Sequence, residues 1–175
     1  LTAGLDASGK VVGMHMRISG QSILASLNPQ GLQNGMDPVT FQGLNPGGAE
    51  GQFGYEIPNL LIDHAMRNPH VLAGFWRGVN LNHNAIYVEC FMDELADVAG
   101  MDPVDFRRQY MGNHPRNLAV LNAVADRIGW KTPPANGVFR GVAQMKAFGS
   151  FVAAACELSV LPGQRVKIHR IVAAT

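Results

Sequence analysis

The sequence predicts a two-layer α+β fold, in which helices pack on one face of a mixed β-sheet. Two observations lead to this prediction. Strand-like segments lie at both ends of the 175-residue chain with helix-like segments between them, and 47% of the residues are hydrophobic while 15% are charged. That composition is typical of a globular domain with a buried core. We expect residues 1–131 to form one segment, with a C-terminal strand segment, residues 132–175, packing on it as one compact unit.

Strand patterns dominate the two ends of the chain. Residues 1–5 and 11–18 flank a polar turn whose Gly9 suits a positive φ, so we expect a β-hairpin. Residues 22–27 fit a strand or a short helix, because six residues are too few for periodicity to decide. Residues 28–54 are rich in glycine and proline and are typical of a surface loop. Further strands are predicted at residues 60–66, 71–75, 139–146, 151–160 and 165–172.

The longest helical pattern starts near Asn84 and ends at Gly100. Glu89, Asp93 and Asp97 recur every four residues, and apolar residues cover the rest of the circumference. We therefore expect a largely buried helix with one acidic stripe. Two hypotheses remain for that stripe: it is exposed to solvent, or Glu89 is buried and paired, for example with Arg77 or with backbone N–H groups.

Two shorter helices are predicted from their end signals. Asp102 followed by Pro103 is typical of a helix N-terminus, which predicts a helix over residues 104–111. Pro115 suits the first turn of a third helix, and Gly129 suits its end. Residues 131–137 form a proline-rich boundary before the C-terminal strands.

Several function classes lack support in the sequence. The net charge is +1 and no run of Lys or Arg occurs, so nucleic acid is not an expected partner. No apolar run approaches the roughly 20 residues that a membrane-spanning helix needs. The six histidines show no spacing of a local metal site, and no nucleophile motif is present. Cys90 and Cys156 lie in apolar patterns, and we expect them to be buried free thiols.

The segment before the long helix is the strongest candidate for a binding site. Phe75, Trp76, Arg77 and Gly78 feed the N-terminus of that helix, where unpaired N–H groups favour an anion or a polar group. Arginine offers a rigid fork of donors to oxygen acceptors, and glycine permits close backbone approach. From the residues alone, Arg77 either contacts a ligand or stabilises the fold.

Several short motifs, in order along the chain, resemble the molybdenum hydroxylase family, which includes xanthine dehydrogenases and aldehyde oxidases. More narrowly, the chain resembles the large, beta subunits of isoquinoline 1-oxidoreductase-like enzymes. The motifs are YEIPN at 55–59, GFWRG at 74–78, MDELA at 92–96 after Glu89, GMDP at 100–103, FRR at 106–108, HPR at 114–116, GW at 129–130 and RGVA at 140–143. The resemblance implies a bacterial oxidoreductase that hydroxylates N-heterocycles or oxidises aldehydes, with water as the oxygen source.

The resemblance also implies roles for the GFWRG turn, which approaches the molybdenum centre in this family. It makes Trp76, Arg77 and Gly78 candidate cofactor contacts and Phe75 and Val79 candidate substrate-wall residues. Relatives such as xanthine oxidase have Phe-Gly where this chain has Val79 and an asparagine, so the substrate is left open. No residue of this chain is assigned as a catalytic group or as a metal ligand.

Members of this family need further segments that the chain lacks, so we expect the chain to be a fragment of a larger subunit. The resemblance implies a molybdenum–molybdopterin cofactor, in its cytosine dinucleotide form, in the full-length protein, with none bound to the fragment. It also implies an iron–sulfur small, alpha subunit and further domains of the large subunit as partners. The fragment is then inactive alone, and the compartment, bacterial cytoplasm or periplasm, stays open. Two alternatives are a structural or interaction domain whose Arg77 turn only packs the core, and a stand-alone small-ligand module.

Overall fold

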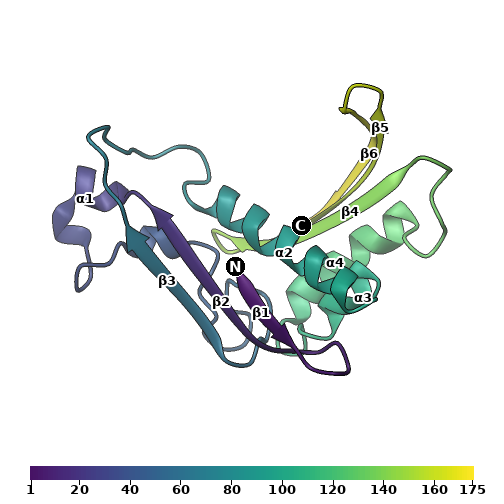
Figure 1. Cartoon of the computed structure of the whole chain (residues 1–175), viewed down its shortest axis with the longest axis horizontal. Helices are drawn as coiled ribbons and strands as arrows, with labels where there is room; N and C mark the ends of the chain where they lie inside the picture. Colours follow the sequence, from purple (N-terminus) through teal and green to yellow (C-terminus); the bar gives the residue numbers. More distant parts are fainter. The chain divides into compact units, whose positions relative to one another are not determined.

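The structure is a computed structural model that describes all residues 1–175 and contains two compact units, each built from helices and strands (Figure 1). Unit 1 comprises residues 1–45 and 57–100, and unit 2 comprises residues 46–56 and 101–175. The α+β class is confirmed, but the strands form two three-stranded sheets instead of one. Residues 101–131 group with the C-terminal strands, whereas the sequence pattern placed them with the N-terminal segment.

The sheet of unit 1 begins with the predicted hairpin. Strand β1 (Thr2–Leu5) pairs antiparallel with β2 (Val11–Gly20), and Gly9 in the turn has a φ of 80°. Strand β3 (Leu60–Met66) lies parallel to β2, with Met14 opposite Leu60. A parallel pair needs a long crossover connection, and the chain between Gly20 and Leu60 provides it.

The crossover contains short helices instead of an unstructured loop. Residues 22–27 form a helix, α1 (Ile23–Leu27), because the Ser22 hydroxyl accepts a hydrogen bond from the Ala25 backbone N–H and caps the first turn. Two 3₁₀ helices follow, η1 (Pro29–Gly31) and η2 (Pro38–Phe41). The open choice between strand and helix at residues 22–27 is thus decided by a local capping residue.

The long helix, α2 (Leu81–Val98), starts three residues before the predicted position. Its burial differs from the prediction, because Ile86 is 61% exposed and Val98 is 74% exposed, whereas Glu89 is only 4% exposed. The hypothesis of a wholly exposed acidic stripe is therefore wrong for Glu89, and the expectation of an otherwise buried helix is wrong as well. Of the stripe, only Asp97 is exposed, and Asp93 is partly exposed.

Unit 2 has two helices and an antiparallel sheet. Helix α3 (Pro103–Arg108) is capped by the Asp102 carboxylate, which accepts hydrogen bonds from two backbone N–H groups. Helix α4 (Pro115–Ile128) ends at Gly129, which has a φ of 77°. The sequence predicts both of these helix ends. Strands β4 (Phe139–Ala147), β5 (Ser150–Leu161) and β6 (Arg165–Ala174) follow in that order across the sheet. Helix α4 contacts all three strands.

The core of unit 2 lies where α4 meets the sheet. Residues on the α4 face of the sheet, Val142, Ala153 and Ala155, are at most 5% exposed. Apolar residues of α4 recur at helical spacing and are equally buried, namely Leu121, Val124, Ala125 and Ile128. One face of the sheet is therefore covered by a helix of the same unit.

Two further expectations are corrected by the structure. Residues 71–75 do not form a strand, and Val71 and Leu72 are exposed. Cys90 is exposed and Cys156 is partly exposed, so neither is a buried thiol, and both are free. None of the helices has both the length and the apolar character that crossing a membrane requires.

Candidate functional site

The GFWRG turn is a tight, exposed backbone reversal at the N-terminus of α2. The Val79 N–H donates to the Trp76 carbonyl at 2.8 Å, and the Leu81 N–H donates to the Gly78 carbonyl at 2.9 Å. Gly78 has a φ of 80° and Val79 has a φ of 50°. A positive φ is rare for a β-branched residue, and such conformations cost about 1–3 kcal/mol each. The turn is thus held in a strained conformation that the rest of unit 1 must stabilise.

Asparagine side chains hold the turn and the start of α2 in place. The Asn82 amide donates to the Arg77 carbonyl at 2.7 Å. The Asn80 amide donates to the Val39 carbonyl at 2.9 Å, and the Asn84 amide donates to the Thr40 and Gln42 carbonyls, both at 2.9 Å. Asn80 is the N-cap residue of α2, yet its side chain makes no capping hydrogen bond. It anchors the helix to the 39–42 segment instead.

The 39–42 segment is in turn fixed by a buried aspartate. Asp37 is fully buried and accepts hydrogen bonds from the Ser22 hydroxyl at 2.7 Å and from the Leu24 and Val39 backbone N–H groups at 3.0 and 2.8 Å. A buried carboxylate needs such partners to offset its lost hydration. Asp37 therefore connects α1 to η2, and η2 overlaps the 39–42 segment that anchors the start of α2.

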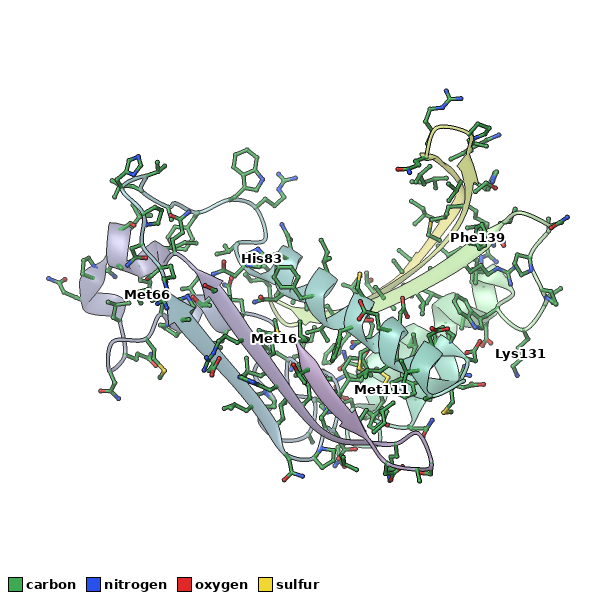
Figure 2. The ribbon with its side chains drawn as sticks, in the orientation of Figure 1. Met16, Met66, His83, Met111, Lys131 and Phe139 are labelled. Atoms are coloured by element: carbon green, nitrogen blue, oxygen red, sulfur yellow. The ribbon has the colours of Figure 1, made fainter.

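A cavity of about 910 Å³ lies in unit 1 beside this turn. Strands β2 and β3, the 72–76 segment and the first two turns of α2 form its wall. Figure 2 shows the side chains of two of these residues, Met16 of β2 and His83 of α2. The wall includes Met16, Ile18, Ile23, Thr40, His64, Leu72, Trp76, Val79, Asn80, Asn82, His83, Ile86 and Tyr87. The volume suits a small organic molecule.

The aromatic and imidazole groups of this wall are fixed by their neighbours. The His83 and Tyr87 rings lie 5.7 Å apart on successive turns of α2. His64 Nε2 lies 3.1 Å from the Gly20 carbonyl, and its ring is edge-on to Phe41 at 6.3 Å. Burial lowers the pKa of His83, which favours its neutral form near neutral pH. The wall therefore combines apolar surface with uncharged hydrogen-bonding groups.

An ion pair adjoins the cavity on the sheet. Arg17, which also lines the cavity, makes two hydrogen bonds to Asp63, at 2.8 and 2.6 Å. The Arg17 guanidinium lowers the pKa of the Asp63 carboxyl to about 2. Asp63 thus remains ionised throughout the physiological range, and its charge is balanced by Arg17.

Two buried polar atoms below the turn have no hydrogen-bond partner within the chain. They are Thr40 Oγ1 and Asn84 Oδ1, on residues that are 4% and 0% exposed. Leaving a buried polar atom unpaired costs about 1–3 kcal/mol, so such atoms usually meet water or a ligand. Thr40 also lines the cavity, although its hydroxyl oxygen is itself buried.

Comparison with curated proteins relates the chain to oxidoreductase subunits. It is 27% identical over 160 residues, 89% of its length, to the beta chain of isoquinoline 1-oxidoreductase from Brevundimonas diminuta. It is 32% identical over 77 residues, 44% of its length, to a nicotinate dehydrogenase subunit of Pseudomonas putida. These matches confirm the resemblance to molybdenum hydroxylases. The chain spans 20% of the length of the first relative and 6% of the second. No protein-family model matches the chain.

The structure places the residues proposed from the molybdenum hydroxylase resemblance on one exposed turn. Trp76 is 84% exposed and lines the cavity together with Val79. Phe75 is 56% exposed and does not line it, and neither Arg77 nor Gly78 does. The Arg77 side chain is exposed, with no hydrogen bond or ion pair to the rest of the chain, so it does not pair with Glu89. The hypothesis that Arg77 only packs the core is therefore wrong for this structure.

Other wall residues were not identified from the sequence. Thr40, His64, His83 and Tyr87 lie on three different elements and show no common motif. The only signal available was the run of asparagines at 80, 82 and 84, an unusual density of side-chain amides at the start of a helix. No group of three or more His, Cys, Asp or Glu side chains is arranged to hold a metal ion.

Proposed function

We propose that this chain is part of the molybdopterin-binding large subunit of an oxidoreductase that hydroxylates N-heterocycles, or oxidises aldehydes, with water as the oxygen source. The exposed Trp76–Gly78 turn beside a 910 Å³ cavity carries the proposal. Similarity over 89% of the chain to an isoquinoline 1-oxidoreductase subunit supports it. The activity is that of the full-length protein, because the chain spans only 20% of that relative.

The residues of the turn suit a molybdenum–molybdopterin cofactor. A Cβ at Gly78 would lie 2.1 Å from Asn82 Oδ1, so only glycine lets the backbone and the Asn82 side chain pack this closely. In this proposal the Trp76 and Gly78 backbone and the unpaired Arg77 guanidinium contact the oxygen acceptors of the cofactor. When bound, the cofactor supplies the two-electron oxidation of the substrate carbon.

The cavity wall gives the substrate its surroundings in this proposal. Val79 and Trp76 line the side nearest the turn, and Tyr87 and His83 lie on α2. Phe75, also on the turn, is proposed as a wall residue once neighbouring domains cover it. A neutral His83 offers a hydrogen bond to a ring nitrogen without adding charge. The chain thus binds and orients the ring, while the catalytic base lies outside residues 1–175.

In the full-length protein the chain is joined by a cofactor and by a partner subunit. The cofactor is proposed to be the cytosine dinucleotide form, and the partner an iron–sulfur small subunit. Both relatives are named as subunits, which supports an assembly of several chains. Residues 1–175 alone are proposed to bind no cofactor and to have no activity, since the base and the other cofactor-binding segments are supplied elsewhere.

Metal and pterin analysis of the full-length large subunit tests this proposal. The subunit would be coexpressed with its iron–sulfur partner, and molybdenum and pterin would be measured in the wild type, in Arg77→Ala and in Arg67→Ala. Arg67 is an exposed arginine whose guanidinium contacts only the Met66 carbonyl, so it controls for loss of charge. We expect both groups in the wild type and in Arg67→Ala, and less of both in Arg77→Ala. A folded wild type without molybdenum would overturn the proposal.

A further inference from the structure

The sheet of unit 2 has one face that no helix of that unit covers. Cross-strand pairing places Phe139, Leu158 and Ile168 in one row, and Val160 and Val166 in the next. Helix α4 packs on the opposite face, where Val142 and Ala155 are buried. Phe139, Val160, Val166, Ile168 and Ile171 are each between 57% and 61% exposed. The uncovered face is therefore a continuous apolar surface.

The apolar face continues onto a hairpin arm that extends beyond β4. The pairing of β4 with β5 ends at Phe139 and Leu158, so residues 159–167 are paired only between β5 and β6 (Figure 1). We call these residues the β5–β6 arm. A two-stranded hairpin with exposed apolar residues is at best marginally stable in water. Covering the arm would remove apolar surface from water and stabilise it.

Strand β6 offers a free edge along its whole length. It is the outermost strand in the order β4-β5-β6, so one row of its backbone N–H and C=O groups has no strand partner. An extended segment can pair with such an edge and continue the sheet. Because side chains alternate in a strand, an added strand would present one set of side chains to each face.

The charges of β6 determine which strand fits. Val166 and Ile168 point to the apolar face, whereas Arg165 and Lys167 point to the other side, opposite the uncharged Leu161 and Ser159. Arg170 and His169 add to the basic character, and the nearest carboxylate of β5, Glu157, is paired with Arg140 at 2.7 Å. Opposite charges across a strand pair stabilise it, and like charges destabilise it. A second copy of β6 would bring basic side chains close to basic side chains.

We propose that the free edge of β6 docks a β-strand of a partner polypeptide in which apolar residues alternate with carboxylates. Its apolar side chains extend the row of Val166 and Ile168, and its carboxylates pair with Arg165 and Lys167. This docking covers the β5–β6 arm and is independent of any cofactor at the GFWRG turn.

Labelled ten-residue peptides test the proposal on the full 175-residue chain. One peptide alternates Val or Thr with Glu, and its match alternates Val or Thr with Lys. Fluorescence anisotropy gives their affinities, and amide hydrogen exchange reports whether β6 becomes protected. We expect the Glu peptide to bind roughly tenfold more tightly than the Lys peptide, with protection confined to β6. Equal affinities, or binding without protection of β6, would overturn the proposal.

Variants separate charge from apolar contact. Arg165→Glu with Lys167→Glu should reverse the preference between the two peptides, whereas Arg127→Glu, a charge reversal on α4, should leave it unchanged. The double variant Val166→Ser, Ile168→Ser should weaken the binding of both peptides. These residues are exposed, so the variants are expected to fold. Self-association of the wild-type chain through β6, seen by sedimentation and blocked by the serine variant, would replace the proposed partner with a second copy.

Discussion

Substitution of Gly78 by alanine tests the conformation of the GFWRG turn most sharply. At its φ of 80°, a residue with a Cβ is disfavoured by about 1–2 kcal/mol. The new Cβ would also lie 2.1 Å from Asn82 Oδ1, so the Asn82 side chain must move away, and its Nδ2 loses the 2.7 Å hydrogen bond that it donates to the Arg77 carbonyl. Such a hydrogen bond contributes about 0.5–1.5 kcal/mol. We therefore expect Gly78→Ala to lower the free energy of unfolding by about 2–3 kcal/mol.

Two other glycines of unit 1 separate these effects. Gly100 has a φ of 65° with no atom within 4 Å of the position that a Cβ would take, so Gly100→Ala should show only the backbone cost of about 1–2 kcal/mol. Gly74 has neither a positive φ nor a close neighbour, so Gly74→Ala should change stability little. Denaturant unfolding measures the stability of all three variants. In an Asn82→Ala background, Gly78→Ala should lower the free energy of unfolding by little more than Gly100→Ala does in the wild type. If Gly78→Ala matched Gly74→Ala, the conformation described for the turn would be refuted.

Three further predictions concern the residues that support the site and the sheet. Asp37→Ala should lower the free energy of unfolding by about 3 kcal/mol or more, because three hydrogen-bond donors lose their acceptor. Asp97→Ala, on the exposed side of α2, should change it little, and a similar effect of both substitutions in denaturant unfolding would contradict the role of Asp37. Arg17→Ala should raise the pKa of Asp63 from about 2 toward its ordinary 3.8, as measured by NMR titration, and an unchanged pKa would refute the assigned cause. Because the pKa of Asp63 is lower in the folded state than in the unfolded state, this carboxylate stabilises the fold above pH 3.8, and the stabilisation is lost as the pH falls through 2. Arg140→Lys should destabilise unit 2 by about 2–3 kcal/mol, since one ammonium cannot replace bonds to Glu157 and to the Gly129 and Thr132 carbonyls, with Arg127→Lys as the neutral control in thermal unfolding.

Local signals predicted much of the secondary structure. The turn at Gly9, the cap at Asp102 and the terminator Gly129 each act within a few residues, so the sequence shows them directly. Residues 71–75 have the apolar pattern of a strand, but in the structure they pair with no other strand and remain exposed. Strand pairing depends on a partner elsewhere in the chain, and a short pattern does not reveal whether that partner exists.

The site was only partly predictable for the same reason. The resemblance pointed to the Trp76–Gly78 turn, which the structure shows to be exposed beside a cavity. The support of that turn comes from contacts such as Asn84 to the Thr40 carbonyl, 44 residues away along the chain. The run of asparagines marks one end of that hydrogen bond, but no local pattern identifies the Thr40 carbonyl as its acceptor. Helix periodicity also placed Ile86 among the buried apolar residues, although it is 61% exposed, and it left open whether Glu89 is buried.

In the proposed function, the Trp76–Gly78 turn meets a molybdenum cofactor in the assembled enzyme. The most direct measurement of this contact is X-ray diffraction from crystals of the full-length large subunit with its iron–sulfur partner, recorded above and below the molybdenum absorption edge. We predict an anomalous peak beside the turn, at the cavity that Trp76 and Val79 line. A molybdenum peak remote from this turn, or no peak in a fully assembled enzyme, would contradict the proposed contact.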